Sequence, residues 1–307
     1  MPRGAGTIEE VGKALAEGLV IPYLGPGVFR EATSVPFPID SMELAEWLSA
    51  RVSVPGRIRG NLTAIAQYIE SHKHRKTLTR LMGEAFSCRG EGCLAPTRVH
   101  RFLTTLPRLP LVVDTWYDAT AAEAFSDPGG QRRALCQISG VSRSEHPDRW
   151  FQYAGDGEPF EAAASDRPEA STQKTILYKP HGSVAPEPNF LVSDSDYVEV
   201  LTEIDIQTPI PPPVQGLREG RHFLFLGCRF NQQLDRIFAR QIMKRSSQRH
   251  WAVFASDGEL TKKEARFLEV QHIAPLWANA EPLVEGLTAV MAATAEFARE
   301  ETSCRSA

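Results

Sequence analysis

The chain has 307 residues, of which 42% are hydrophobic and 23% are charged; these values are close to those of soluble globular proteins and exclude a disordered or collagen-like chain. The 34 Lys and Arg residues against 38 Asp and Glu leave a net charge of -4, which gives no general attraction to a phosphate backbone, so we expect no nucleic-acid partner. No apolar run approaches the ~18 residues that span a bilayer, so we expect no membrane partner either.

The N-terminal third predicts a helix, a buried strand and a helical insertion. A capping box that begins at Thr7 opens the first helix. The apolar run 19–24 then stops at Gly25-Pro26-Gly27, as expected for a buried parallel strand that enters a tight turn. Residues 41–86 carry helical apolar spacing, so we expect a helical insertion over about 41–108.

The middle of the chain predicts two further strands on either side of an irregular segment. Residues 109–115 form one candidate buried strand, and another ends at Tyr178. The stretch 126–174 is rich in Gly, Pro, Ser and Asp, which predicts an irregular insertion of loops with short strands.

The C-terminal third alternates strands with helices. The prolines from Pro209 to Pro213 indicate a stiff, extended connection. Strands are expected at 223–226, 251–255 and 273–276, each followed by a helical pattern. Residues 299–307 are polar and are expected to form a flexible tail.

This alternation predicts an α/β fold, specifically a Rossmann-like doubly wound parallel sheet. We expect one domain over residues 1–298 that includes both insertions. Ligand sites in such sheets lie at the carboxyl ends of the strands. Four unusual segments follow predicted strands and are expected to line one crevice: 25–27, 114–118, 181–183 and 227–231.

Each of these segments allows a functional and a structural interpretation. The glycines at 25 and 27 would let the backbone approach a pyrophosphate, or would form an ordinary turn. His181 is a candidate general base or a structural histidine. Asp118 is a candidate ligand-binding carboxylate or the N-cap of the next helix. The turn from Gly227 to Asn231 would hold an adenine-ribose group, or would only join a strand to a helix.

The four motifs occur in a fixed order along the chain, namely Gly25-Pro26-Gly27, Thr115-Trp116-Tyr117-Asp118, Lys179-Pro180-His181-Gly182-Ser183 and Gly227-Cys228-Arg229. This order resembles that of the sirtuin-like family of NAD-consuming proteins. Its members show a Gly-Ala-Gly turn, a Thr-x-Asn-x-Asp strand end, a Lys-x-His-Gly-Ser segment and a Gly-x-Ser turn. The resemblance extends from about Thr7 to Ala295.

The resemblance implies a sirtuin-like fold with NAD across the carboxyl edge of the sheet. It implies that His181 acts as the catalytic base and that Asp118 orients the sugar. The residues that it implies for binding NAD or ADP-ribose are Gly25, Pro26, Gly27, Thr115, Trp116, Gly227, Cys228, Arg229 and Asn231. It also implies a role in prokaryotic anti-phage defence.

Three residues depart from the family pattern. Trp116 stands where the family has an asparagine beside the nicotinamide ribose, and an indole cannot both donate and accept as an amide does. Pro26 removes a backbone N–H from the phosphate turn. Arg229 replaces a small Ser or Thr, and its guanidinium offers a bidentate phosphate contact instead.

The five cysteines are scattered and odd in number, which predicts reduced thiols and a cytoplasmic protein. Deacylases of this family carry a zinc module with two cysteine pairs. Only Cys88 and Cys93 have suitable spacing here, so we expect no metal.

The sequence thus favours an NAD glycohydrolase that releases nicotinamide and ADP-ribose. One alternative is a catalytically silent module that senses NAD or ADP-ribose, which the tryptophan at 116 favours. The other is a protein deacylase, which the missing cysteine pair disfavours. A homo-oligomer or a partner protein is left open by the sequence.

Overall fold

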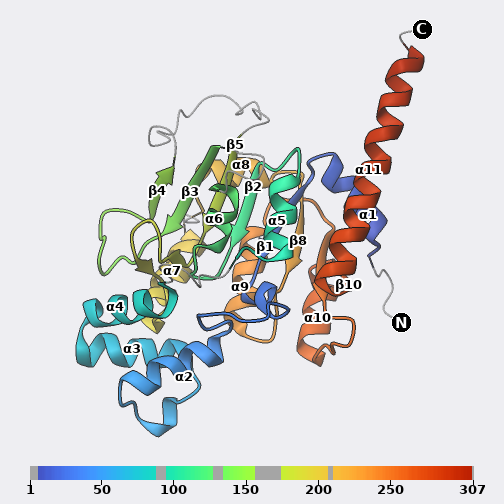
Figure 1. Ribbon diagram of the computed structural model, residues 1–307. Helices are drawn as coiled ribbons and strands as arrows, with labels where there is room; N and C mark the ends of the chain where they lie inside the picture. The colour runs from blue at the N-terminus through green and yellow to red at the C-terminus, as the bar shows by residue number, and fades with distance from the viewer. Residues whose placement is uncertain (1–5, 88–94, 127–133, 156–173, 207–209, 306–307) are drawn as a thin grey trace.

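The computed structural model describes residues 6–87, 95–126, 134–155, 174–206 and 210–305, and it describes no side chains at 201–206 or 298–305. An eight-stranded sheet forms its centre, in the order β10-β9-β8-β1-β2-β5-β3-β4 (Figure 1). The strands are β1 (Val20–Leu24), β2 (Leu111–Asp114), β3 (Ala134–Gly140), β4 (Phe151–Gly155), β5 (Lys174–Lys179), β8 (His222–Leu226), β9 (His250–Phe254) and β10 (Ile273–Trp277). All neighbours pair in parallel except β3 with β4, which are antiparallel.

Helices cover both faces of this sheet, so the predicted doubly wound α/β fold is confirmed. Side chains of β1 alternate between the two faces, with Val20 and Leu24 in one core and Ile21 and Tyr23 in the other. The first core is closed by α1 (Ile8–Ala16), α5 (Arg98–Thr105), α6 (Thr120–Ser126) and α11 (Ala280–Arg305). The second is closed by α8 (Pro212–Arg218), α9 (Gln233–Ile242) and α10 (Lys262–Val270).

The strand order reverses between β1 and β8. From β1 the chain builds the sheet outward through β2 on one side, and it later returns to β8 on the other side. Such a topological switch point leaves a crevice at the carboxyl ends of the two strands, because their connections leave in opposite directions. The turns after β1 and β8 are the first and fourth of the predicted site segments.

A helical module stands at this carboxyl edge of the sheet (Figure 1). It consists of α2 (Ser41–Arg51), α3 (Leu62–Lys73) and α4 (Arg75–Phe86), which lie within the predicted insertion and share a third hydrophobic core. Asp40 and Asn61 cap the first two helices through their side-chain oxygens. The module therefore has its own core, and it also packs on Trp116, Tyr117 and Phe190 from the main body.

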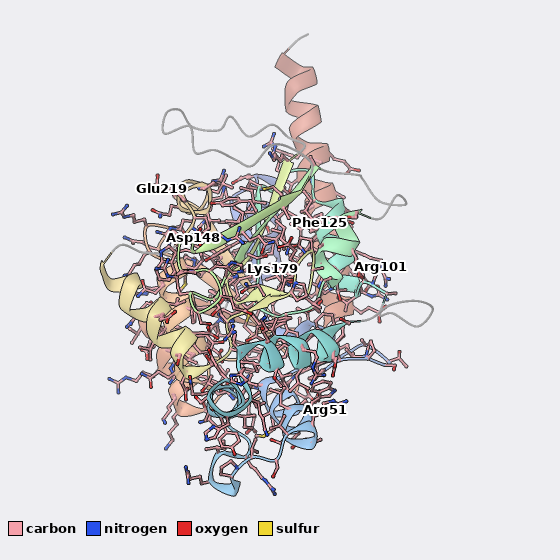
Figure 2. All side chains as sticks on the ribbon, turned by 90° about the vertical axis from the view of Figure 1, so that its left-hand side faces the viewer. Arg51, Arg101, Phe125, Asp148, Lys179 and Glu219 are labelled. Carbon is pink, nitrogen blue, oxygen red and sulfur yellow. The ribbon has the colours of Figure 1, made fainter. Side chains whose placement is uncertain are left out.

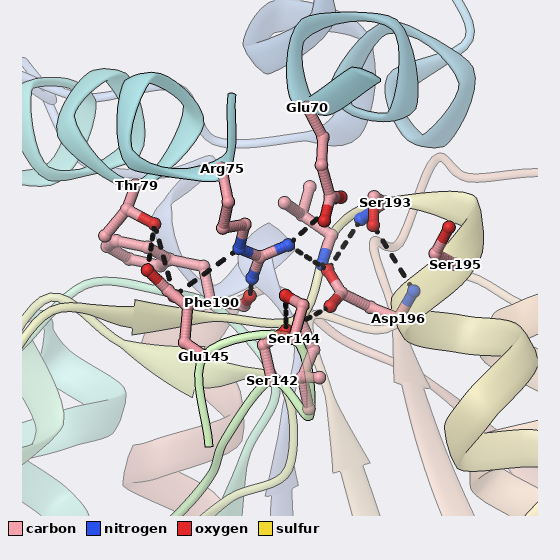
Figure 3. A network of polar contacts seen from close by, with 12 residues as sticks. Glu70, Arg75, Thr79, Ser142, Ser144, Glu145, Phe190, Ser193, Ser195 and Asp196 are labelled. Carbon is pink, nitrogen blue, oxygen red and sulfur yellow. Dashed lines mark hydrogen bonds and ion pairs between the residues drawn. The ribbon is translucent and has the colours of Figure 1, made fainter. Parts of the chain in front are cut away.

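A partly buried ion-pair network fastens the module to the main body (Figure 3). Arg75 at the start of α4 lies 2.8 Å from Asp196, 3.3 Å from Glu70 and 3.4 Å from Glu145, and it also donates to the Phe190 carbonyl. Burial opposes the charge on Arg75, but Asp196 and the other carboxylates raise the pKa of its guanidinium above the usual value.

Asp196 lies at the centre of this network. It belongs to α7 (Asp194–Ile206), and its carboxylate accepts hydrogen bonds from Ser142 Oγ at 2.7 Å and from the backbone N–H groups of Val192 and Ser193. The segment next to α7 includes a small hairpin of β6 (Gly182–Ser183) and β7 (Asn189–Phe190). The module, the hairpin and α7 are therefore held together at the site's edge.

Three details differ from the expectations. The irregular insertion contributes β3 and β4 to the main sheet, and residues 134–139 of β3 pair with β5. Residues 299–305, expected as a tail, continue the helix α11. The proline-rich connection is helical from Pro212, because proline is tolerated in the first turn of a helix. Within the residues that the structure describes, no helix is long and apolar enough to cross a membrane.

Candidate functional site

The predicted segments line one cavity of about 850 Å³ between the sheet and the helical module. This volume lies within the range of small-molecule and cofactor sites, roughly 300–1,000 Å³. The walls include the first turns of α2, α3 and α9. Of the predicted site residues, the cavity is lined by Gly25, Pro26, Gly27, Thr115, Trp116, His181, Gly227, Cys228, Arg229 and Asn231.

Two glycine turns interlock at the floor of this cavity. Gly25 N donates to Leu226 O and Gly27 N donates to Gly227 O, each at 2.9 Å. A Cβ at Gly27 would lie 2.6 Å from Gly227 O, and one at Gly227, where φ is +65°, would lie 2.2 Å from Val28 N. Glycine is therefore required at these positions because one backbone passes directly against the other.

The same contacts occupy the backbone N–H groups that were expected to bind a pyrophosphate. Pro26 has no N–H, Gly25 and Gly27 donate to the second turn, and Val28 donates to Gly25 O at 3.2 Å within the 3-10 helix η1 (Pro26–Phe29). The first turn thus differs from the anion-binding turn that the glycines alone suggest. Arg30, which follows η1, is a cationic side chain on the cavity wall; it is exposed and forms no ion pair within the described residues.

His181 has a buried, unpartnered ring nitrogen. Its ring packs edge-on against Phe238 and Tyr197, with centroids 4.6 and 5.8 Å away, and within the described part of the chain Nε2 has no hydrogen-bond partner. Burial, with a smaller contribution from the Lys179 charge, lowers the pKa of His181 to about 4. The imidazole is therefore neutral at pH 7 and able to accept a proton or a hydrogen bond.

A buried ion pair lies two residues before His181 in the chain. Lys179 is 1% exposed, and its Nζ lies 2.6 Å from Asp114 Oδ2 and 2.8 Å from Asp118 O. Figure 2 shows Lys179, the last residue of β5, near the middle of the molecule. Burial outweighs the nearby Lys179 charge and raises the pKa of Asp114 to about 6. The pair joins the carboxyl ends of β2 and β5.

Asp118 is the one predicted site residue that does not line the cavity. It is 2% exposed, and its Oδ1 accepts a hydrogen bond from Thr120 N at 2.8 Å at the start of α6. Its Oδ2 is buried and has no partner among the described residues. This position fits the helix-capping alternative.

Trp116 is anchored in the module core. Its Nε1 donates to Pro38 O at 2.8 Å, and its ring packs against Phe86 and Tyr117 with centroids 5.7 and 5.2 Å away. The indole therefore forms part of the cavity wall and fixes the loop before α2.

Replacing Trp116 with phenylalanine should lower the free energy of unfolding by about 1–2 kcal/mol, because the Pro38 carbonyl loses its buried donor. Urea denaturation measures the change, and Trp277→Phe, at a ring that is 43% exposed, is the control. Equal stability of wild type and Trp116→Phe would contradict an anchoring role for the indole.

The second glycine turn is also largely committed to internal contacts. Arg229 binds Glu264 bidentately, at 2.7 and 2.9 Å, so its guanidinium is engaged rather than free to hold a phosphate. The hydrogen bonds from Arg229 and Thr261 outweigh burial and lower the pKa of Glu264 to about 2. The Cys228 thiol is buried against backbone carbonyls, and burial raises its pKa well above the usual value. Asn231 is exposed on the cavity wall.

Sequence reasoning missed Asp235, which lies in the first turn of α9 and lines the cavity. It is half-buried, and burial, offset in part by the charge of Arg236, raises its pKa to about 7. The available signal was its helical spacing: Asp235 precedes Phe238 by three residues, so the two share one face of α9.

Comparisons with known proteins define the family. A family described as SIR2-like domain matches residues 110–276, more than half of the chain. The chain therefore belongs to the SIR2-like domain family. A solved structure from work on the mechanism and regulation of Sir2 enzymes is 11% identical, with a TM-score of 0.46 and coverage of 94% of this chain and 98% of the other. No curated protein matches.

The zinc expectation concerns a segment that the structure does not describe. Cys88 and Cys93 both lie in residues 88–94. Within the described ranges, no group of three or more His, Cys, Asp or Glu side chains could hold a metal ion.

Proposed function

We propose that this protein binds NAD in the cavity and hydrolyses it to nicotinamide and ADP-ribose. The observation that carries the proposal is the buried, unpartnered Nε2 of His181, a residue that lines the cavity together with three other strand-end segments of a SIR2-like chain. A neutral imidazole is the group needed where an attacking water must lose a proton.

The proposed reaction breaks the bond between the nicotinamide nitrogen and C1′ of the ribose. The bonding electrons leave with nicotinamide, which departs neutral because the ring was cationic, and an oxocarbenium-like sugar remains. Water adds to C1′, and His181 accepts the proton that this water loses. A weak base is sufficient, because water becomes strongly acidic as it bonds to an oxocarbenium carbon. The products are nicotinamide, ADP-ribose and one proton.

The enclosure of the site also supports the proposal. Trp116, Tyr117, Tyr197 and Phe238 all line the cavity, and they provide apolar walls that limit the access of bulk water to the sugar. Gln232 at the start of α9 donates to Ser41 Oγ at 2.7 Å, so the second glycine turn and the helical module are linked across the cavity.

The phosphates need a different partner from the one that the glycine motif suggests. Because the N–H groups of Gly25, Gly27 and Val28 are engaged, we propose that Arg30 supplies the positive charge that meets the pyrophosphate. Arginine suits this role, since its planar guanidinium matches phosphate oxygens in a bidentate arrangement.

Arg30→Gln should therefore weaken NAD binding about tenfold and leave the rate of nicotinamide release at saturating NAD within about twofold. The affinity and the saturated rate are measured together. Arg101→Gln removes an exposed arginine on α5 and should change neither (Figure 2). Unchanged NAD affinity in Arg30→Gln would mean that Arg30 does not bind the pyrophosphate.

A second function, binding without hydrolysis, is favoured by one observation. Trp116 occupies the place of the family asparagine and is fixed by its bond to Pro38 O, so its indole does not position a water as an amide would. In this case the protein would sense NAD or ADP-ribose.

One experiment separates the two functions. Purified wild type is incubated with NAD while bound NAD and free nicotinamide are followed together. Binding with nicotinamide release above background supports the hydrolase, and binding without release supports the sensor. Absence of NAD and ADP-ribose binding would reject both.

A further inference from the structure

Asp235 is an acid that lines the cavity and has no ion-pair partner among the described residues. Within the described part of the chain, its carboxylate forms no ion pair and accepts no hydrogen bond. The adjacent Arg236 is occupied elsewhere, since its guanidinium donates to the Phe230 and Asn231 carbonyls.

The groups around Asp235 come from four other segments, and none of them is cationic. Its charge contributes to raising the pKa values of Tyr23 on β1, Tyr117 after β2, Tyr197 on α7 and Cys228 after β8. All four groups stay neutral near pH 7 because their pKa values rise from ordinary values that are already higher. The adjacent Arg236 is therefore the cation that offsets the charge of Asp235, and it does so only in part.

Asp235 lines the same cavity as His181, and it shares a helix face with a residue that packs on the His181 ring. Phe238, three residues further along the same face of α9, is the residue whose ring lies 4.6 Å from the His181 ring. An exposed aspartate in the first turn of a helix is common, because it complements the helix dipole. Asp235 differs because burial makes its charge costly, and a bound cation would offset that cost.

We propose that Asp235 is a specificity-determining residue whose carboxylate faces the positively charged nicotinamide ring and makes the site prefer NAD to NADH. This inference rests on the proposed binding of NAD in the same cavity. NAD and NADH share the ribose, pyrophosphate and adenosine, and they differ in the charge of the nicotinamide ring. A carboxylate in a partly desolvated cavity therefore distinguishes the oxidised ligand from the reduced one by charge.

The test compares the affinities of NAD, NADH and ADP-ribose for wild type and for Asp235→Asn. Dissociation constants are measured at pH 8, where Asp235 is ionised, by stopped-flow tryptophan fluorescence in the first seconds after mixing, before NAD is consumed. Wild type should bind NAD about tenfold more tightly than NADH. Asp235→Asn should lose most of that preference through weaker NAD binding, with ADP-ribose affinity within about twofold of wild type.

Two further variants control this comparison. Asp148→Asn makes the same chemical change at an exposed position outside the cavity lining and should keep the wild-type preference (Figure 2). Asp235→Glu retains the charge and should keep most of the preference, and thermal unfolding verifies that each variant is folded.

The possible failures are distinguishable. Equal affinity of wild type for NAD and NADH, or an unchanged preference in Asp235→Asn, would overturn the role of Asp235 while leaving NAD binding in place. Failure of wild type to bind NAD, NADH and ADP-ribose would overturn the proposed function and this inference together.

Discussion

Replacing His181 with alanine should slow nicotinamide release by about 10²–10⁴-fold and change NAD affinity by only a few-fold. The imidazole accepts a proton only as water bonds to the sugar, so its contribution appears in the rate and not in ground-state binding. The buried, unpartnered Nε2 is the atom that would accept this proton.

The measurement is the single-turnover rate of nicotinamide release with NAD affinity determined in parallel. His72→Ala, on the exposed side of α3, is the matched control and should behave as wild type. Thermal unfolding of His181→Ala is needed because the ring also packs on Phe238 and Tyr197. A folded His181→Ala protein with the wild-type rate would remove His181 from the mechanism.

Trp116→Asn tests the sensor alternative by restoring the asparagine of the family pattern. If Trp116 prevents hydrolysis, the family asparagine should introduce nicotinamide release in a wild type that binds NAD without turnover. The smaller side chain also leaves a hole beside Phe86 and Tyr117 and removes the bond to Pro38 O, so this variant is compared at a temperature where its fold is verified.

Lys179→Met should lower the free energy of unfolding by about 3–5 kcal/mol, because it leaves the buried Asp114 carboxylate without its counter-charge. The cost also includes the donor lost by the Asp118 carbonyl. Guanidinium chloride denaturation measures it. The double variant Lys179→Met with Asp114→Leu should recover much of the stability, since it removes the stranded charge as well.

Lys13→Met removes an exposed Lys–Glu pair on α1 and should leave the denaturation midpoint nearly unchanged. A similarly small effect of Lys179→Met would mean that Asp114 is neutral in the native protein, which its pKa of about 6 disfavours at pH 8. Stability is therefore best compared at that pH.

The regular parts of this fold were predictable from local patterns. The strands β1, β2, β8, β9 and β10 are short apolar runs that end at turn residues or precede helical spacing, and such runs carry their own signal. The switch point at β1 and β8 follows from the same alternation. The convergence of the four motifs could therefore be expected from the sequence alone.

The strand β3 shows what local patterns left open: short strands were expected within 126–174, but their place in the main sheet was not predicted. Gln137 and Ser139 are polar but buried, and Gln137 Nε2 donates to Ser139 Oγ and to Ala185 O, 48 residues away. The sequence around them resembles a loop because the partner that satisfies Gln137 is distant in the chain. Asp235 was missed for a related reason: it lines the cavity together with Tyr23 of β1 and Tyr197 of α7, which are distant from it in the chain.

The interlocked glycine turns have a consequence for how this family diverges. The backbones after β1 and β8 are in contact. A side chain at Gly25 or Gly27 would therefore displace the turn after β8, and one at Gly227 would displace the turn after β1. A homologue could accept such a side chain only if both turns changed together, although about 200 residues separate the two turns in the chain. Across homologues we therefore expect the three glycines to be kept together or replaced together. We expect the residue at Pro26, between Gly25 and Gly27, to vary independently of them.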